Sequence, residues 1–213
     1  MSDIFPLANT RFMTKTLSLS SEIDRFLVSS VSDVLTRLQS VDSDVVVLVE
    51  ERPEELDLDI GPVVQSLPNF EKRASLTRVQ SHATVSTALS EMGLASEQLE
   101  SQMVGHIELF ANLFEQEKME VRIELTDRQS CPKFHCDNVF VRMLVTYCGP
   151  TTEFIDHREP EIIFRAPLSS VVFLKGHKHP TYQDRILHRS PEFTNGVKRL
   201  TMILNFCDWM GKR

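Results

Sequence analysis

Hydrophobic residues recur at helical spacing through much of the first half of the chain. Val85, Leu89 and Met92 form one apolar face, which ends at Gly93. A longer apolar stripe follows Ser96 and consists of Leu99, Met103, Ile107, Phe110 and Phe114. This pattern predicts two consecutive helices, the second of which begins just after Ser96.

The segments before these helices are less regular. Residues 21–24, Ser-Glu-Ile-Asp, resemble a helix capping box, and apolar residues follow at helical spacing at positions 23, 26, 27, 34, 35 and 38. Residues 44–50 contain a continuous apolar run that predicts a short buried strand. Residues 52–69 hold three prolines and few periodic signals, so we expect an irregular segment. We therefore expect residues 1–118 to form a mainly helical scaffold.

From residue 119 onward the pattern changes to alternation. Val121, Ile123 and Leu125 alternate with polar residues, which predicts a half-buried strand. Further short apolar runs lie at 139–147, 161–165, 170–175 and 200–206, separated by turn signals such as Gly149-Pro150. Many short strands without intervening helices indicate a sandwich or barrel. The sequence thus predicts a single α+β domain over 1–213, with its sheets in 119–213.

Composition narrows the possible partners. The 213 residues carry 23 Lys and Arg against 30 Asp and Glu, a net charge of −7, which disfavours nucleic-acid binding. The longest apolar run is far too short for a membrane helix. The start of the chain shows no secretory signal pattern, and no two of the four cysteines are spaced CxxC. We therefore expect a cytoplasmic protein with free thiols.

The candidate chemistry lies in the strand-rich half, which holds five of the seven histidines. Residues 131–137 read Cys-Pro-Lys-Phe-His-Cys-Asp, and residues i and i+2 of an extended segment point to the same side. His135 and Asp137 therefore present an imidazole and a carboxylate to one point. A third ligand from a distant strand would complete the two-histidine, one-carboxylate set of non-haem Fe(II) oxygenases.

Two later segments strengthen this interpretation. His188 lies in Leu187-His-Arg-Ser-Pro191 and could supply the third ligand. Arg199 and Thr201 share one face of the apolar run 200–206. A guanidinium beside a hydroxyl suits a carboxylate, because arginine offers it a planar fork. Lys198 is adjacent to Arg199, so the pattern leaves open which cation enters the pocket.

The order HxD, His and R-x-T resembles the Fe(II)- and 2-oxoglutarate-dependent dioxygenase superfamily, whose fold is a double-stranded β-helix, or jelly roll. More narrowly, the segments 131–137, 142–153 and 187–191 resemble a bacterial family known only as domain of unknown function 1826. The resemblance implies a jelly-roll core preceded by N-terminal helices. Resemblance to that family also implies a link with metal homeostasis, because some of its members are encoded near zinc-responsive metallochaperone GTPases.

The superfamily resemblance implies a role for each candidate residue. His135, Asp137 and His188 would bind Fe(II), Arg199 would pair with the distal carboxylate of 2-oxoglutarate, and Thr201 would add a hydrogen bond. If no bulge intervenes, Tyr147 has the strand parity of His135, so we expect its hydroxyl to reach the cosubstrate as well. The implied reaction is hydroxylation or demethylation of a small-molecule or protein substrate. The sequence names neither the substrate nor the oligomeric state.

Two other functions stay open. A jelly roll can hold zinc or iron without oxidising anything, as a metal-binding protein of metal homeostasis. A hydrolase that uses metal-bound water is the weaker alternative, because Arg199 and Thr201 would then lack a purpose.

Other residues near the candidate ligands have less specific signals. Cys131 and Cys136 bracket His135 and could favour zinc, but their spacing fits no standard zinc finger, and we expect buried structural thiols. We expect a loop role for His177 and His179, and exposure for His157. Glu153 could orient a ligand histidine from behind or lie on the surface.

Overall fold

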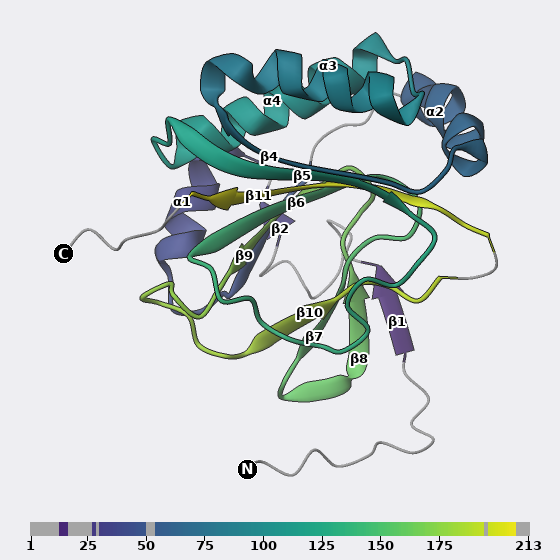
Figure 1. Cartoon of the computed structure of the whole chain (residues 1–213). Coiled ribbons are helices and arrows are strands. Elements are labelled where there is room, and N and C mark those ends of the chain that lie inside the picture. The colour runs from purple at the N-terminus through teal and green to yellow at the C-terminus, as the bar shows by residue number, and fades with distance from the viewer. Residues whose placement is uncertain (1–12, 17–26, 29, 50–53, 194–195, 208–213) are drawn as a thin grey trace.

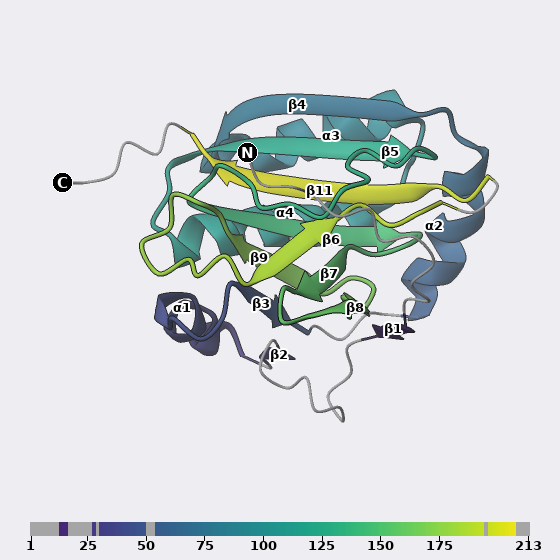
Figure 2. The same ribbon diagram turned by 90° about the horizontal axis from the view of Figure 1, so that it is seen from below.

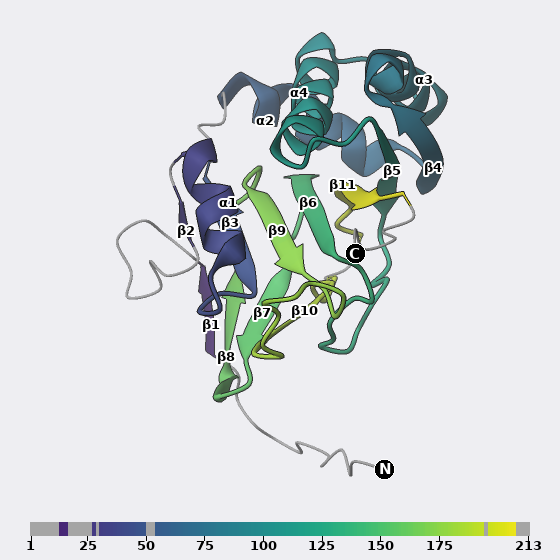
Figure 3. The same cartoon turned by 90° about the vertical axis from the view of Figure 1, so that its left-hand side faces the viewer.

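The computed structural model describes residues 13–16, 27–28, 30–49, 54–193 and 196–207. These residues form three layers, in which helices cover the outer face of a large sheet and a smaller sheet lies against its inner face (Figures 1 and 3). The helices are α1 (Val31–Gln39), α2 (Glu54–Ser66), α3 (Ser81–Met92) and α4 (Glu97–Leu113), with a 3-10 turn at Arg78–Gln80. None of these described helices is long and apolar enough to cross a bilayer.

Two sheets make up the core of the fold. The four-stranded sheet has the order β1 (Met13–Thr16), β8 (Glu159–Arg165), β7 (Glu153–Asp156) and β10 (Ile186–Arg189). The seven-stranded sheet has the order β2 (Leu27–Val28), β3 (Val45–Leu48), β9 (Val171–Lys175), β6 (Val141–Cys148), β11 (Arg199–Phe206), β5 (Lys118–Thr126) and β4 (Phe70–Thr77). Most neighbouring strands are distant in sequence, as in a jelly roll. Figure 2, seen from the side of the smaller sheet, shows β10 crossing the inner face of the larger one.

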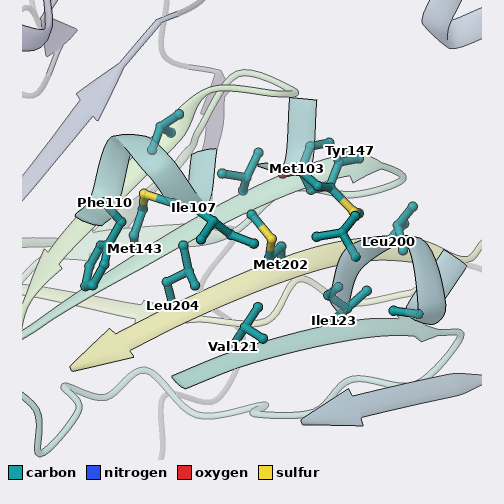
Figure 4. Close-up of a cluster of buried hydrophobic side chains, with 14 of the residues drawn as sticks. Met103, Ile107, Phe110, Val121, Ile123, Met143, Tyr147, Leu200, Met202 and Leu204 are labelled. Carbon is teal, nitrogen blue, oxygen red and sulfur yellow. The ribbon is translucent and has the colours of Figure 1, made fainter. Parts of the chain in front are cut away.

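The helix-covered face of the large sheet carries the main hydrophobic core (Figure 4). Alternate residues of β5, β6 and β11 pack there against the apolar stripe of α4. The two helices predicted on either side of Gly93 are confirmed: α3 ends at Gly93 with a left-handed φ of 80°, and the Ser96 hydroxyl accepts a hydrogen bond from the backbone of Leu99 at the start of α4. A second cluster fills part of the space between the sheets; it comprises Val45, Val47, Phe154, Phe164, Ala166, Val172, Leu174 and Ile186.

The expected division of the chain needs correction. The strand predicted at 44–50 is present as β3, but β4 lies in the part expected to be mainly helical, and both strands join the large sheet. The segment expected to be irregular forms α2, with Pro62 inside it; Ile60 and Val64 of this helix are fully buried. Leu27 lies in β2 rather than a helix, and the proposed capping box at 21–24 falls outside the described residues.

Candidate metal centre

The two candidate histidine ligands meet because their backbones pair. His135 and His188 form an isolated antiparallel bridge, in which each amide donates to the other's carbonyl at 3.0 Å. Side chains of directly paired residues lie on the same face of a sheet. The two imidazole rings accordingly lie side by side, with centroids 4.6 Å apart. The segment before β6 thus adds one residue of pairing beside β10.

Asp137 completes the group. Its Oδ1 lies 3.7 Å from Nε2 of His135, and its Oδ2 lies 3.1 Å from Nε2 of His188. One donor atom from each of the three side chains lies within 4.8 Å of the others. Two imidazole nitrogens and a carboxylate oxygen are a ligand set for iron or zinc. Three such ligands on one side of a metal ion leave its other side open. The structure therefore brings together the three residues that the sequence nominated.

Close backbone packing fixes the position of Asp137. The backbone of His177 donates to the Asp137 carbonyl at 2.9 Å, and Lys178 donates to the carbonyl of Val139 at 3.1 Å. A Cβ at Gly176 would lie 2.6 Å from the Asp137 carbonyl oxygen and closer still to that of Val139. Only glycine at position 176 allows this approach.

The protonation states suit metal binding. Nδ1 of His135 lies 2.9 Å from the carbonyl of Lys133, which can only accept, so the proton belongs on Nδ1 and Nε2 has a free lone pair. Burial lowers the pKa of His188, which favours the neutral, ligating imidazole. Burial would raise the pKa of Asp137, but the hydrogen bond with His188 and the charge of Arg142 outweigh it, so this pKa lies below its ordinary value.

Arg142 is a neighbour of the site that the sequence did not reveal. Its Nη1 donates to Asp137 Oδ2 at 2.6 Å, and its Nε donates to Asn205 Oδ1 at 3.0 Å. Arg142 and Asn205 are register partners on β6 and β11, so the pairing of these strands aims the guanidinium. The signal in the sequence that could have revealed Arg142 was its position as a charged residue among the apolar residues of a predicted strand.

Arg199 shares a cavity with His135 and His188, two of the three candidate ligands. Its side chain is 5% exposed, and its Nη2 donates to the hydroxyls of Thr152 at 2.8 Å and Thr146 at 3.3 Å. Its Nε has no hydrogen-bond partner, and no carboxylate among the described residues lies within 4.0 Å of the guanidinium. Burial lowers its pKa to about 10. The charge of Glu124, which also lines the cavity, raises this pKa, but the Glu124 carboxylate is paired with Arg122 and makes no contact with Arg199 within 4.0 Å. A buried cation without a contacting counter-ion is costly, so this cavity favours an anion.

The wall of this cavity combines residues from the two sheets. His135, His188, Arg142, Arg199 and Thr201 all line it. Its volume is about 50 Å³, the space of a cation with very few waters, so a five-carbon dicarboxylate requires the side chains to move outward. Of the two adjacent cations, Arg199 lines the cavity and Lys198 does not. The Lys198 ammonium instead donates to the carbonyl of Leu67, at the end of α2.

The predicted contact of Tyr147 with a cosubstrate does not fit the structure. Tyr147 is fully buried in the helix-facing core (Figure 4), where its hydroxyl lies 2.7 Å from Nδ1 of His106 on α4. The parity argument assumed one continuous strand from His135 onward. The chain instead bends at residues 138–140 as it passes between the sheets, and the bend breaks the alternation.

The cysteines are not arranged as predicted. Cys131 is exposed at the edge of the cavity, so the expectation of a buried thiol is wrong there. Cys136 is half-buried, with its Sγ 3.5 Å from the Asp137 carbonyl, and burial raises the pKa of this thiol. A raised pKa disfavours the thiolate that zinc binding requires.

The remaining polar candidates lie outside the ligand group. His177 is exposed, whereas His179 is buried and accepts a hydrogen bond from the Thr181 backbone at 3.3 Å; burial lowers the pKa of His179 to about 4. His157 is exposed, as expected. Glu153 is buried and bonds Arg165 and Arg189 at 2.5–3.0 Å, rather than a ligand histidine.

A family model described as "Protein of unknown function (DUF1826)" matches residues 23–205. A search of curated proteins found no match.

Solved structures share the fold at low sequence identity. A rice dioxygenase for auxin oxidation is 12% identical, with a TM-score of 0.51 over 83% of this chain and 76% of that one. JOX2, solved in complex with 2OG, Fe and JA, is 8% identical, with a TM-score of 0.52 over 95% of this chain and 77% of that one. Together with the strand order, these similarities establish a jelly-roll fold.

Proposed function

The chain belongs to the family of proteins of unknown function DUF1826, and we propose that it is an Fe(II)- and 2-oxoglutarate-dependent oxygenase. One observation carries the proposal: the histidines of a two-histidine, one-carboxylate group line a cavity together with a buried arginine, and no carboxylate of the described residues lies within 4.0 Å of that arginine. The two histidines and the aspartate alone would suit either iron or zinc. The unpaired guanidinium adds a requirement for an anion beside that metal.

Each residue has a defined task in this proposal. His135, Asp137 and His188 would hold Fe(II) from one side. When bound, Fe(II) and 2-oxoglutarate supply the oxidation of 2-oxoglutarate by O₂ to succinate and CO₂, coupled to oxidation of a substrate C–H bond.

The surrounding residues orient these groups. Arg199 would bind the distal carboxylate of 2-oxoglutarate through its fork, and Thr201, 1% exposed beside it on the same strand face, would add a hydrogen bond. Arg142 occupies Asp137 Oδ2 and so favours ligation through Oδ1 alone, which keeps coordination positions open for reactants.

The test is binding under anaerobic conditions. Fe(II)-loaded protein with 2-oxoglutarate is expected to develop a weak visible charge-transfer band, and admission of O₂ is expected to release succinate. Arg199→Met should abolish both signals. Lys198→Met is the matched control, because the side chain of Lys198 points to the end of α2 and away from the cavity.

A non-catalytic metal-binding protein makes the opposite prediction. It would bind Zn(II) tightly, give no band with Fe(II) and 2-oxoglutarate, and release no succinate. That result would overturn the oxygenase proposal. The buried Arg199 guanidinium favours the oxygenase, since a zinc carrier has no use for it.

A further inference from the structure

A groove of about 390 Å³ adjoins the candidate metal centre on the inner face of the large sheet. Arg122, Arg142 and Ile203 line both the groove and the cavity of the metal centre. Arg142 also contacts Asp137, so the groove begins next to a candidate metal ligand. Its volume lies in the range typical of small-molecule sites, roughly 300–1,000 Å³.

Strand register places the groove at the opposite end from Arg199. Along β11, Arg199 and Thr201 line the cavity, Ile203 lines both spaces, and Asn205 lines the groove. The row across the sheet at Asn205 contains Glu120 on β5 and Arg142 on β6. A cosubstrate anchored at Arg199 would therefore leave the groove free.

Guanidinium groups dominate the groove wall. Arg73 and Arg122 are register partners on β4 and β5, and both contact Glu71 at 2.7–2.8 Å. Glu71 is not among the residues of the groove wall; it lies two positions from Arg73 on the same strand, one row closer to Arg199. These contacts hold the two arginines in place from the side of the metal cavity.

Each of the three arginines keeps one terminal nitrogen free. Hydrogen bonds and ion pairs among the described residues use Nε and Nη2 of Arg73 and Arg122, and Nε and Nη1 of Arg142. The remaining Nη atoms have no partner in the described part of the chain. The one carboxylate of the wall, Glu120, is exposed. Free donors therefore outnumber free acceptors in the groove.

We propose that this groove binds the substrate and that it selects an oxyanion, a carboxylate or phosphate, through Arg73, Arg122 and Arg142. The assignment to substrate rests on the proposed oxygenase function; the anion selectivity rests on the groove alone. Among the described residues of the groove wall, Ile203 is the only apolar residue whose side chain lies on the inner face of the sheet. Ala74 and Val121 also border the groove, but their side chains pack toward the helices. An uncharged apolar substrate would leave the guanidinium edges unpaired.

The test uses small probes in the presence of saturating 2-oxoglutarate, so that Arg199 is occupied. N-acetyl-L-aspartate α-amide and N-acetyl-O-phospho-L-serine amide each carry one of the two oxyanions, and N-acetyl-L-asparagine amide and N-acetyl-L-serine amide are their neutral counterparts. With Mn(II) as the metal, paramagnetic broadening of probe NMR signals reports binding beside the metal without any turnover. Titration of the same probes against metal-free protein reports the groove by itself.

The expected result is preferential binding of an anionic probe, about tenfold tighter than its neutral counterpart. The probe that binds better identifies the carboxylate or the phosphate as the natural group. Arg73→Gln should weaken this binding about tenfold, because it removes a guanidinium that lines the groove. The Arg73 side chain is two-thirds exposed, so the substitution should leave the fold intact. Lys72→Gln is the matched control on the same strand, since Lys72 pairs with Glu91 on the helix side and should have no effect.

Other outcomes separate the two proposals. Equal binding of anionic and neutral probes, or no effect of Arg73→Gln, overturns the anion selectivity even if 2-oxoglutarate binds. In the titration of metal-free protein, loss of probe binding in Arg199→Met without a loss in Arg73→Gln overturns it as well, because the probe would then occupy the Arg199 cavity. Arg73-dependent anion binding without the Fe(II)–2-oxoglutarate band supports the anion site and overturns the oxygenase.

Discussion

The two faces of the seven-stranded sheet differ in chemistry even where both are buried. On β11, Leu204 and Met202 face the helices and are fully buried. Arg199 and Thr201, on the other face of the same strand, are 5% and 1% exposed. Burial of apolar groups stabilises the fold, whereas burial of an unpaired cation opposes it. The comparison teaches that low exposure alone does not identify a core, because the inner face is buried at a cost that a ligand could offset.

The space between the sheets repeats this contrast. Apolar residues of β3, β9 and the smaller sheet fill one part of it. The part beneath β5, β6 and β11 holds the candidate metal ligands, Arg199 and the arginine groove. One pair of sheets thus forms a packed core at one end and a polar site at the other.

Neighbouring residues of β11 allow the most direct test of the two faces. Leu204→Ala should lower the free energy of unfolding by about 2–5 kcal/mol, because it opens a cavity in the main core. Ile203→Ala, which faces the cavity and groove, should cost about 1 kcal/mol or less. Denaturant unfolding of the two variants measures the difference, and equal losses would contradict the comparison.

Loss of a ligand should act on metal affinity instead of folding. Asp137→Ala is expected to weaken Mn(II) or Zn(II) binding at least about 100-fold, because it removes the only carboxylate of the three-residue group. Cys136→Ala is the adjacent control and should leave the affinity nearly unchanged. Competition with a chelator gives both values; similar losses in the two variants would point to a thiol-containing site.

Removal of the buried cation from the inner face should raise the stability, whereas removal of an apolar side chain from the helix-covered face lowers it. Arg199→Met is expected to raise the stability of the metal-free protein by about 1–3 kcal/mol, because an apolar side chain replaces a charge without a counter-ion. The same change should abolish 2-oxoglutarate binding. A loss of stability above about 1 kcal/mol would show that the guanidinium serves the fold.

The smallest expected effect concerns Tyr147, which the sequence assigned to the wrong face. Tyr147→Phe should cost about 1 kcal/mol of stability, because it removes the hydroxyl bonded to His106. Affinity for 2-oxoglutarate should not change, since the ring lies among the helix-facing residues. Calorimetric titration beside thermal unfolding tests both statements, and a weakened 2-oxoglutarate affinity would restore Tyr147 to the site.

Local patterns predicted the elements whose own residues carry a clear periodicity. The apolar stripes of α3 and α4 and the alternation in β5 are properties of each segment alone, and each matches an element. The pattern did not predict β4, because Leu76 is the only buried residue of this strand; backbone pairing with β5 holds it in the sheet. β7 has no alternating pattern, since its buried acids Glu153 and Asp156 are paired with arginines of other segments.

The candidate site divides in the same way. Spacing alone placed His135 and Asp137 on one side of an extended segment, and the resemblance assigned roles to His188 and Arg199, which later segments had already offered as candidates. The backbone bridge between His135 and His188, the contact of Arg142 with Asp137 and the helix-facing position of Tyr147 depend on how distant segments pair and where the chain bends. The sequence by itself therefore determined which chemical groups are present and the period of each strand. Only the tertiary structure decided which of those groups face each other, because strand pairing and the bend at 138–140 are set by contacts between segments far apart in the chain.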